Sequence, residues 1–553
     1  MFIDSSVTRL SGKAYTRHLL RETYREDGKV KHRTLANLTH CKPEEVEAIR
    51  LALKYKGDLG RILASAGEGG PELKQGLSIG AVWVLAQLAR ELGVVAALGS
   101  DRQGKLALWQ VIARVLDQGS RLSAVRLAGG HAVGAALGMA GFDEDDLYAN
   151  LDWLADNQAD IESRLFARRE AASTPDVFFY DVTRTYLEGE HNAFVAFGSN
   201  RDRKSGKRQI VIGLLADADG RPLSIEVFKG NTSDVKTFSS QLNKAAARFG
   251  AERVTFVGDR GMIKAPQRAE LGAAGFHSIT AITKAQIDAL IAAGVLQMDL
   301  FEETLAEVEG LGGERYVLRR NPARAAELAA ARADKLKTLQ AAAEAANAYL
   351  SPHPRAAAKT QLARLKAKSE TLHVDKFLAV ADEGRRVAVT VDEAALAEAA
   401  RRDGCYALRT DLPKTGVDKQ IVHDRYKDLA QVEWAFRDSK TVQLEMRPVY
   451  LRDENRTRGH ALVVMLAYLL TQALRQRWRD IDLTVQEGLG RLASLCLVEG
   501  IIGGQPSYNQ VPTPRDDVRS LFEAADIVIP SALPLVSARV ATNQNLPQRR
   551  KAK

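Results

Sequence analysis

The spacing of hydrophobic and polar positions predicts a compact helical unit over residues 76–170. Apolar side chains recur there at helical spacing in three segments separated by glycine-rich joints. These segments are IGAVWVLAQLARELGV, KLALWQVIARVLDQG and DEDDLYANLDWLADNQADIESRLFARR. Two interpretations stay open for this unit: a DNA-binding domain of helix-turn-helix type, or a helical subdomain that only packs against its neighbours.

The first 75 residues carry a different pattern. Two strand-like segments, AYTRHLLRETYRED and KVKHRTLANL, flank Asp27-Gly28, a dipeptide typical of tight hairpin turns. The segment KPEEVEAIRLALK follows, and Pro43 with acidic residues in the first turn predicts a short helix. We therefore expect a β-hairpin followed by a helix.

From residue 175 the pattern predicts a mixed α/β sheet, because three strands are followed by alternating helix and strand. Asp219-Gly220 predicts a hairpin between the second and third strands. The predicted elements are DVFFYDVTRTYLE, RQIVIGLLAD and PLSIEVFKG as strands, SDVKTFSSQLNKAAARFG as a helix, RVTFVGDRG as a strand, APQRAELGAAG as a helix and FHSITAIT as a strand.

Residues 285–400 interrupt this sheet with an alanine-rich helical stretch and short strands. The strand CYALRTDL then precedes two helices, DRYKDLAQVEWAFRDSK and the strongly apolar HALVVMLAYLLTQALRQRW. No periodicity is clear after about residue 503, so we expect a loosely ordered tail. The predicted regions are 1–75, 76–170, 171–285 and 403–480 as two parts of one core, 286–402 as an insertion, and 481–553.

Composition excludes several classes of protein. The 553 residues are 45% hydrophobic and 27% charged, which is typical of globular chains. No run of about 18 apolar residues suggests a membrane span, and the start MFIDSSVTRLSGK lacks the apolar stretch of a signal peptide. Cys41, Cys405 and Cys496 are too far apart to suggest a disulfide framework. We expect a cytoplasmic protein without a membrane partner.

The positive charge is concentrated in one segment. The chain has a net charge of +9, and residues 311–370 hold twelve Lys or Arg against five acids. This segment includes Arg319, Arg320 and Arg324, and it permits a polyanionic partner. Two interpretations stay open: a surface that neutralises phosphates, or a solvated basic helix face.

Two aspartates follow apolar strands. Asp181 comes after Val177–Tyr180 and Asp259 comes after the apolar run 254–257. Sites in open α/β sheets collect at the carboxyl ends of strands, so the two side chains are expected to converge. The alternative is that each is an ordinary turn residue at a strand end.

A third carboxylate lies on a predicted helix. Glu433 falls at helical spacing with Tyr426, Leu429, Arg437 and Lys440, on a face that the apolar residues turn inward. The alternative is an i,i+4 ion pair with Arg437. Three carboxylates suit two Mg²⁺ or Mn²⁺ ions, which prefer oxygen ligands and support phosphoryl transfer. The ten histidines form no HxxxH spacing, which disfavours a zinc hydrolase.

These segments resemble the DDE transposases of bacterial insertion-sequence elements. The matching motifs are FFYDVTRTYLE, FKGNTSDVKTF and GDRGM, in that order. One branch of the family has an insertion before the last acid and a Tyr-Arg-Glu-Lys helix signature. Tyr426, Glu433 and Lys440 have its spacing, whereas Leu429 replaces the signature Arg.

The resemblance implies an RNase H-like α/β core with an α+β insertion and an N-terminal DNA-binding region of hairpin and helices. It implies Asp181, Asp259 and Glu433 as ligands of two Mg²⁺ ions, for which Mn²⁺ substitutes. It also implies that water first attacks the phosphodiester at the element's ends and that the freed 3′-hydroxyl then attacks target DNA. The implied partners are double-stranded DNA and further copies of the chain, as a dimer or larger synaptic assembly in the bacterial cytoplasm, associated with the nucleoid when bound to DNA.

Other side chains are candidates for DNA contacts. Trp434 stacks on a displaced base or packs in the core, and these alternatives stay open. The remaining candidates are basic or aromatic: Arg260, Arg319, Arg320, Arg324, Tyr426, Arg437 and Lys440. Two other functions also stay open: an RNase H-like nuclease without strand transfer, and a catalytically silent DNA-binding protein.

Overall fold

The computed structural model describes most of the 553-residue chain. The described residues are 1–10, 13–26, 28–55, 72–170, 177–187, 191–198, 206–249, 254–259, 262–440, 444, 446, 451–502, 505–536 and 538–542. Among them, no helix is both long enough and apolar enough to cross a membrane.

An eight-stranded mixed sheet forms the centre of the fold, which confirms the predicted α/β sheet. Its strand order is β11-β12-β15-β10-β9-β6-β7-β8. The pairs β6–β9 and β9–β10 are parallel, and the other pairs are antiparallel. The strands are β6 (Val177–Tyr186), β7 (Gln209–Ala216), β8 (Pro222–Lys229), β9 (Thr255–Gly258), β10 (His277–Ala281), β11 (Ala306–Glu309), β12 (Arg315–Arg320) and β15 (Cys405–Thr410).

Helices cover both faces of this sheet. Successive side chains of a strand point to opposite faces, so the apolar residues of the central strands need a helix on each side. Phe178 of β6 belongs to one core with Phe238 of α10 (Asp234–Phe249) and Leu271 of α11 (Ala265–Ala273). Phe179 belongs to the other core, which includes residues of α17 (Ala430–Lys440) and α18 (Glu454–Arg477). The central strands are therefore buried on both sides, as their apolar runs predict.

The predicted helical unit shares a core with the sheet. Helix α18 is buried along most of its length and packs against α5, α8 and β8. Its apolar side chains therefore connect the helices of the unit to the sheet, and residues of both belong to one hydrophobic cluster. The helices of the unit are α3 (Gly80–Glu91), α4 (Val94–Leu98), α5 (Arg102–Leu116), α6 (Arg121–Gly130), α7 (Val133–Leu137), α8 (Glu144–Asp156) and α9 (Gln158–Glu170).

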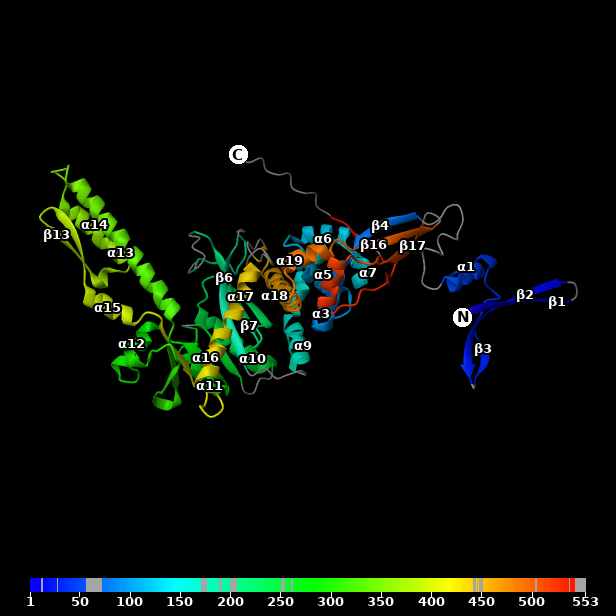
Figure 1. Ribbon diagram of the computed structural model, residues 1–553, viewed down its shortest axis with the longest axis horizontal. Coiled ribbons are helices and arrows are strands. Elements are labelled where there is room, and N and C mark those ends of the chain that lie inside the picture. The colour runs from blue at the N-terminus through cyan, green and yellow to red at the C-terminus, as the bar shows by residue number, and fades with distance from the viewer. Residues whose placement is uncertain are drawn as a thin grey trace.

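A separate module emerges between two neighbouring strands of the sheet. Strands β12 and β15 are antiparallel with Arg320 opposite Cys405, and the chain between them forms a long helical projection at one end of the molecule (Figure 1). The module has its own hydrophobic cluster. Its elements are α13 (Pro322–Leu350), α14 (Ala358–Thr371), β13 (Leu378–Glu383), β14 (Arg386–Val391) and α15 (Glu393–Arg401).

The predicted insertion range 286–402 therefore contains two kinds of structure. Strands β11 and β12 extend the central sheet, and α12 (Lys284–Ala292) precedes them. Only the part from α13 to α15 projects from the sheet. The boundaries of the six predicted regions stay predictions.

The expectation of a loosely ordered tail is wrong for the described residues after 503. Strand β17 (Gln505–Gln510) pairs with β16 (Cys496–Ile502), and β16 pairs with β4 (Glu72–Ser78). Helix α20 (Asp516–Ala524) buries Val518, Leu521 and Phe522. The partner strand β4 lies more than 400 positions earlier, so local periodicity does not reveal this order. Helix α19 (Val485–Leu492) and the short strands β5 (Gly141–Phe142), β18 (Ala532–Leu533) and β19 (Arg539–Val540) complete the region.

The N-terminal hairpin is confirmed, and the structure adds a strand that the sequence pattern does not predict. Strands β2 (Lys13–Glu26) and β3 (Lys29–Asn37) pair with Glu26 opposite Lys29, and Gly28 has a positive φ of 75°. Asp27 lies outside the described residues. Strand β1 (Phe2–Leu10) pairs with β2, and α1 (Pro43–Lys54) follows as predicted.

Candidate active site

Asp181 lies on β6, and Asp259 directly follows the neighbouring parallel strand β9. The register pairs Tyr180 with Gly258, so the next residue of β6 is Asp181 and the residue that directly follows β9 is Asp259. Both side chains are half-buried. The structure thus brings together two acids that are 78 positions apart, as the strand-end argument predicts.

The predicted strand DVFFYDVTRTYLE is confirmed, and the alternative that Asp181 is a turn residue at a strand end is wrong. Strand β6 continues to Tyr186, because residues beyond Tyr180 remain paired with β7 on the other side. Only the parallel pairing with β9 ends at Tyr180. The Asp181 carboxylate also accepts a hydrogen bond from the backbone N–H of Val182, at 2.7 Å.

Glu433 lies one turn into α17, which packs against β6. The single helix predicted around it is in fact two helices, α16 (Lys419–Asp428) and α17, joined at Leu429. The backbone N–H of Leu429 bonds the carbonyl of Tyr426, three residues back, in a tight turn. The predicted inward face is also partly wrong, because Leu429 is only 4% exposed whereas Glu433 and Arg437 are exposed.

A cavity of about 510 Å³ joins Asp259 to Glu433. Tyr426 of α16 and Arg324 of the projecting module also line it, so four of the predicted side chains meet there. Asp181 does not line it. The full lining is Asp259, Ala281, Lys284, Asn321, Arg324, Leu328, Gly404, Cys405, Tyr406, His423, Tyr426, Lys427, Leu429, Ala430 and Glu433.

The donor chemistry of the three acids fits a hard divalent cation, since all are carboxylates and magnesium prefers oxygen ligands. Asp181 lies on β6, Asp259 directly follows the adjacent strand β9, and Glu433 lines the same cavity as Asp259. Within the described residues, no three His, Cys, Asp or Glu side chains are grouped closely enough to hold a metal ion. The three acids fit such an ion by the type of ligand they offer.

Sequence reasoning misses several polar side chains of this cavity. His423 is buried, its Nδ1 lies 3.3 Å from an Asp424 oxygen, and its Nε2 lies 2.7 Å from the hydroxyl of Tyr406. Burial lowers the pKa of His423. Lys284 is the first residue of α12, directly after the cap residue Thr283. The capping box formed by Thr283 and Gln286 is a pattern in the sequence that could have located this helix start and therefore Lys284.

The three arginines of the basic segment differ in their surroundings. Arg319 donates from Nε to the Glu303 carbonyl at 2.9 Å, and Arg320 donates from Nε to the Asp403 carbonyl at 3.1 Å. Arg324 is exposed and lines the cavity, and it pairs with Glu327 at 2.7 Å. Arg324 is therefore the best placed of the three to reach a ligand in this cavity.

Trp434 is 56% exposed, so the alternative that it packs in the core is wrong. Its neighbour Val432 is buried, so the helix turns Trp434 outward beside Glu433. Arg260 lies outside the described residues, as does the side chain of Lys440 at the end of α17.

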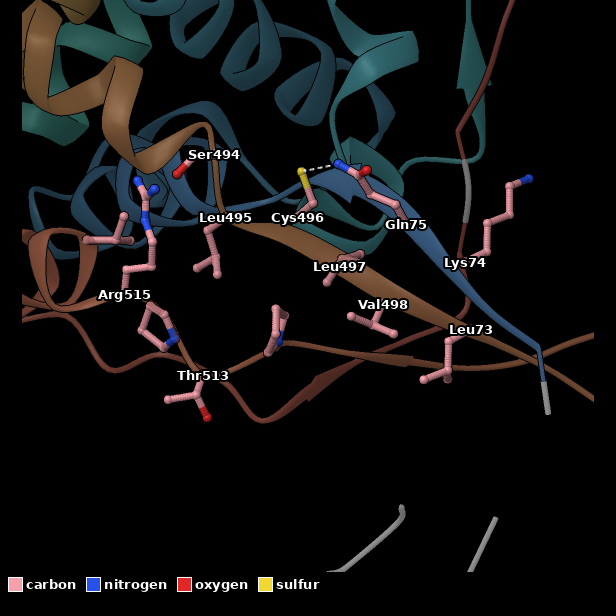
Figure 2. A pocket seen from close by; sticks show the side chains of 13 residues that line it. Leu73, Lys74, Gln75, Ser494, Leu495, Cys496, Leu497, Val498, Thr513 and Arg515 are labelled. Carbon is pink, nitrogen blue, oxygen red and sulfur yellow. Dashed lines mark hydrogen bonds between the residues drawn. The ribbon is translucent and has the colours of Figure 1, made fainter. Parts of the chain in front are cut away.

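A second cavity, of about 540 Å³, is remote from these acids. It lies between β4, β16 and residues 512–518, and its walls are mostly aliphatic (Figure 2). The amide of Gln75 donates to the sulfur of Cys496 at 3.6 Å across one side of it. None of the predicted site residues lines this cavity.

Comparison with known proteins finds two family models, one for the N-terminal region and one for the region of the central sheet. A family model described as "IS1634 family transposase, N-terminal domain" matches residues 4–65, and one described as "Transposase DDE domain" matches residues 172–470. No curated protein matches. Among solved structures, a cryo-EM structure of the piggyBac transposase synaptic complex with hairpin DNA is similar, with TM-score 0.33 and 10% identity over 79% of this chain and 84% of that one.

The DDE model covers the region that contains Asp181, Asp259 and Glu433, together with the central sheet and the projecting module. This range is more than half of the chain. The protein therefore belongs to the DDE transposases of insertion-sequence elements.

Proposed function

We propose that this transposase binds the terminal inverted repeats of its insertion sequence, cleaves the ends and joins them to target DNA. The observation that carries the proposal is the position of three acids. Asp181 lies on β6 and Asp259 directly follows the neighbouring parallel strand β9. Glu433 lines the same cavity as Asp259 and lies on a helix that packs on β6.

We assign Asp181, Asp259 and Glu433 as the residues that hold two Mg²⁺ ions, with Mn²⁺ as a substitute. When bound, such ions stabilise charge on phosphoryl oxygens and make water a better nucleophile. The side chains of Arg324 and Tyr426 line the same cavity and orient the scissile strand by binding its phosphates. Arg437 follows Glu433 by one turn and extends this contact, and Arg260 and Lys440 are assigned to the same task from sequence alone.

The exposed Trp434 stacks on an unpaired base at the end of the element. An indole that is 56% exposed offers an aromatic face to solvent, and base–aromatic stacking contributes about 1–3 kcal/mol per base. The N-terminal region reads the repeats, and two or more copies of the chain hold paired ends in the bacterial cytoplasm at the nucleoid.

The test uses the full chain with Mg²⁺ and a supercoiled plasmid that carries the repeats flanking the gene. The variants are Asp181→Asn, Asp259→Asn and Glu433→Gln, each of which removes one charge with little change in volume. We expect each to lower end cleavage by at least about 10³-fold while repeat binding persists. Asp480→Asn is the matched control, because the Asp480 side chain is 86% exposed and far from these acids in the sequence.

Each alternative has its own outcome. Cleaved ends that never join target DNA would favour a nuclease without strand transfer. Binding of the repeats without any cleavage by the unmodified chain would favour a catalytically silent DNA-binding protein. Cleavage that survives Asp181→Asn would contradict the assignment of the acids.

A further inference from the structure

A cavity of about 380 Å³ lies where two helices begin beside the central sheet. It borders the N-termini of α10, a helix of 16 residues, and α11, a helix of 9 residues. Its lining comprises Arg184, Gly198, Gly230, Asn231, Thr232, Ser233, Asp234, Val235 and Lys264. The segment Asn231–Asp234 belongs to the motif FKGNTSDVKTF, which the proposed catalytic step does not use.

Arg184 supplies the main sign that this cavity takes a ligand. Its side chain is only 9% exposed, and its Nη2 donates to an Asp234 oxygen at 2.6 Å. Its Nη1 is buried and has no hydrogen-bond partner among the described residues. A buried donor without an acceptor costs about 1–3 kcal/mol, so a ligand oxygen here would remove a penalty that the folded chain now bears.

The charges around the cavity favour an anion. The Asp234 carboxylate offsets the charge of Arg184. Lys264, an exposed residue directly before α11, then adds a positive charge. The N-termini of α10 and α11 both border the cavity, and helix N-termini bind phosphate groups readily.

The cavity is near the candidate active site but separate from it. Arg184 follows Asp181 by three residues on β6, so the two side chains lie on opposite faces of the sheet. Lys264 follows Asp259 by five residues, just beyond the end of β9. Arg184 and Lys264 thus lie within five residues of the two aspartates along the chain.

We propose that this cavity binds a backbone phosphate of DNA a short distance from the scissile phosphate. The inference rests on the proposed function, because it takes DNA as the ligand. Arg184 and Lys264 donate to the phosphate oxygens, and the start of α10 supports its negative charge. Binding of this kind positions the duplex and does not read its sequence.

The test measures anisotropy of a fluorescein-labelled 30-base-pair duplex from the element's end, with the full chain at several salt concentrations. We expect Lys264→Gln to weaken binding by about fivefold at 0.1 M salt and to lower the salt slope by about one. Arg184→Lys keeps the charge but loses the planar fork, so we expect weaker binding with an unchanged slope. Lys236→Gln is the matched control, since Lys236 is exposed in the first turn of α10 but does not line the cavity.

Wild-type affinity and slope in both Lys264→Gln and Arg184→Lys would overturn the proposal. If Arg184→Lys does not fold, the affinity and salt slope of Lys264→Gln alone test the proposal, because Lys264 is exposed and its substitution should not affect folding. Inorganic phosphate that raises the melting temperature of the wild type but not of Lys264→Gln, with DNA affinity unchanged in that variant, would assign the cavity to free phosphate and overturn the DNA contact.

The proposal and the proposed function fail in distinguishable ways. If the wild type cleaves and joins ends while Lys264→Gln binds the duplex normally, only the proposed phosphate site is wrong. If the wild type never cleaves while Lys264→Gln binds the duplex more weakly, only the proposed transposition reaction is wrong.

Discussion

At the scale of single residues, His460 shows how a buried polar side chain makes stability depend on pH. It lies on α18, with its Nδ1 3.3 Å from Nη2 of Arg121. Burial lowers the pKa of His460 well below its usual value, and the charges of Arg114 and Arg121 act in the same direction. The imidazole is therefore neutral in the folded chain near pH 6, where an unfolded chain takes up a proton.

A proton that binds only the unfolded chain favours unfolding, so stability falls as the pH drops below about 6.5. We predict that His460→Gln flattens this dependence by up to about 1.4 kcal/mol per pH unit. The measurement is the melting temperature of both proteins at pH 7.5, 6.5 and 5.5. His423, whose pKa burial also lowers, keeps a smaller dependence of the same sign in the variant. If the melting temperature of His460→Gln falls with decreasing pH as much as that of the wild type, the prediction is wrong.

Substitution of Trp434 is expected to affect DNA cleavage but not stability. Because the indole is 56% exposed, Trp434→Ala should change the free energy of unfolding by no more than about 0.5 kcal/mol. End cleavage should fall, since the variant loses a stacking surface beside Glu433, and Trp434→Phe should keep most of it. Thermal unfolding and plasmid cleavage check the two halves. A large fall in melting temperature would indicate a packing role, and normal cleavage by Trp434→Ala would argue against stacking.

At the scale of elements, the turn between α16 and α17 positions Glu433. Leu429 occupies the place of the signature Arg and is buried, so it fixes the turn by packing and not by charge. The apolar side chain is compatible with its surroundings, whereas a guanidinium at 4% exposure would need buried partners. This explains in physical terms why the chain tolerates the departure from the signature.

We predict that Leu429→Ala destabilises the protein by about 2–5 kcal/mol, because it leaves a cavity where the helices join. Cleavage should fall as well, since Glu433 lies one turn further along. Ile421→Ala is the control on α16, because Ile421 is 42% exposed and its truncation should cost little. Thermal unfolding of the two variants decides the point, and equal melting temperatures would contradict the packing argument.

At the scale of the whole molecule, the projecting module is attached at two adjacent points. Arg320 and Cys405 are opposite each other on β12 and β15, so the module interrupts what would otherwise be a hairpin. It has a separate hydrophobic cluster. It contributes Arg324 and Leu328 to the wall of the cavity that contains Asp259 and Glu433.

We predict that replacement of residues 322–403 by Asn-Gly leaves a folded core, because this dipeptide favours a two-residue hairpin turn. End binding should weaken and depend less steeply on salt, since the replaced range holds 14 Lys or Arg against 11 acids, and these basic residues include Arg324 of the cavity wall. Circular dichroism, thermal unfolding and duplex binding test the change. An unfolded product would show that the module is needed for the core, and an unchanged salt slope would remove its role in DNA binding.

The sequence by itself determined the type of most elements of the central sheet and of the helices beside it, and it singled out the three acids as candidates. Apolar periodicity depends on each segment's own side chains, so strands such as β6 and helices such as α13 are readable locally. The motifs around Asp181, Asp259 and Glu433 also pointed to the family that the DDE model confirms. Their roles in catalysis stay predictions.

Only the tertiary structure decided which distant segments meet. The adjacency of Asp181 and Asp259 depends on the pairing of β6 with β9, and the order near the C-terminus depends on the pairing of β16 with β4. The exposure of Trp434 and the break at Leu429 depend likewise on packing between elements. The same is true of the Arg184 nitrogen, which has no hydrogen-bond partner in the part of the chain that the structure describes. Local sequence specifies the form of an element, whereas its neighbours are selected by complementary surfaces elsewhere in the chain, and no pattern within one segment records them.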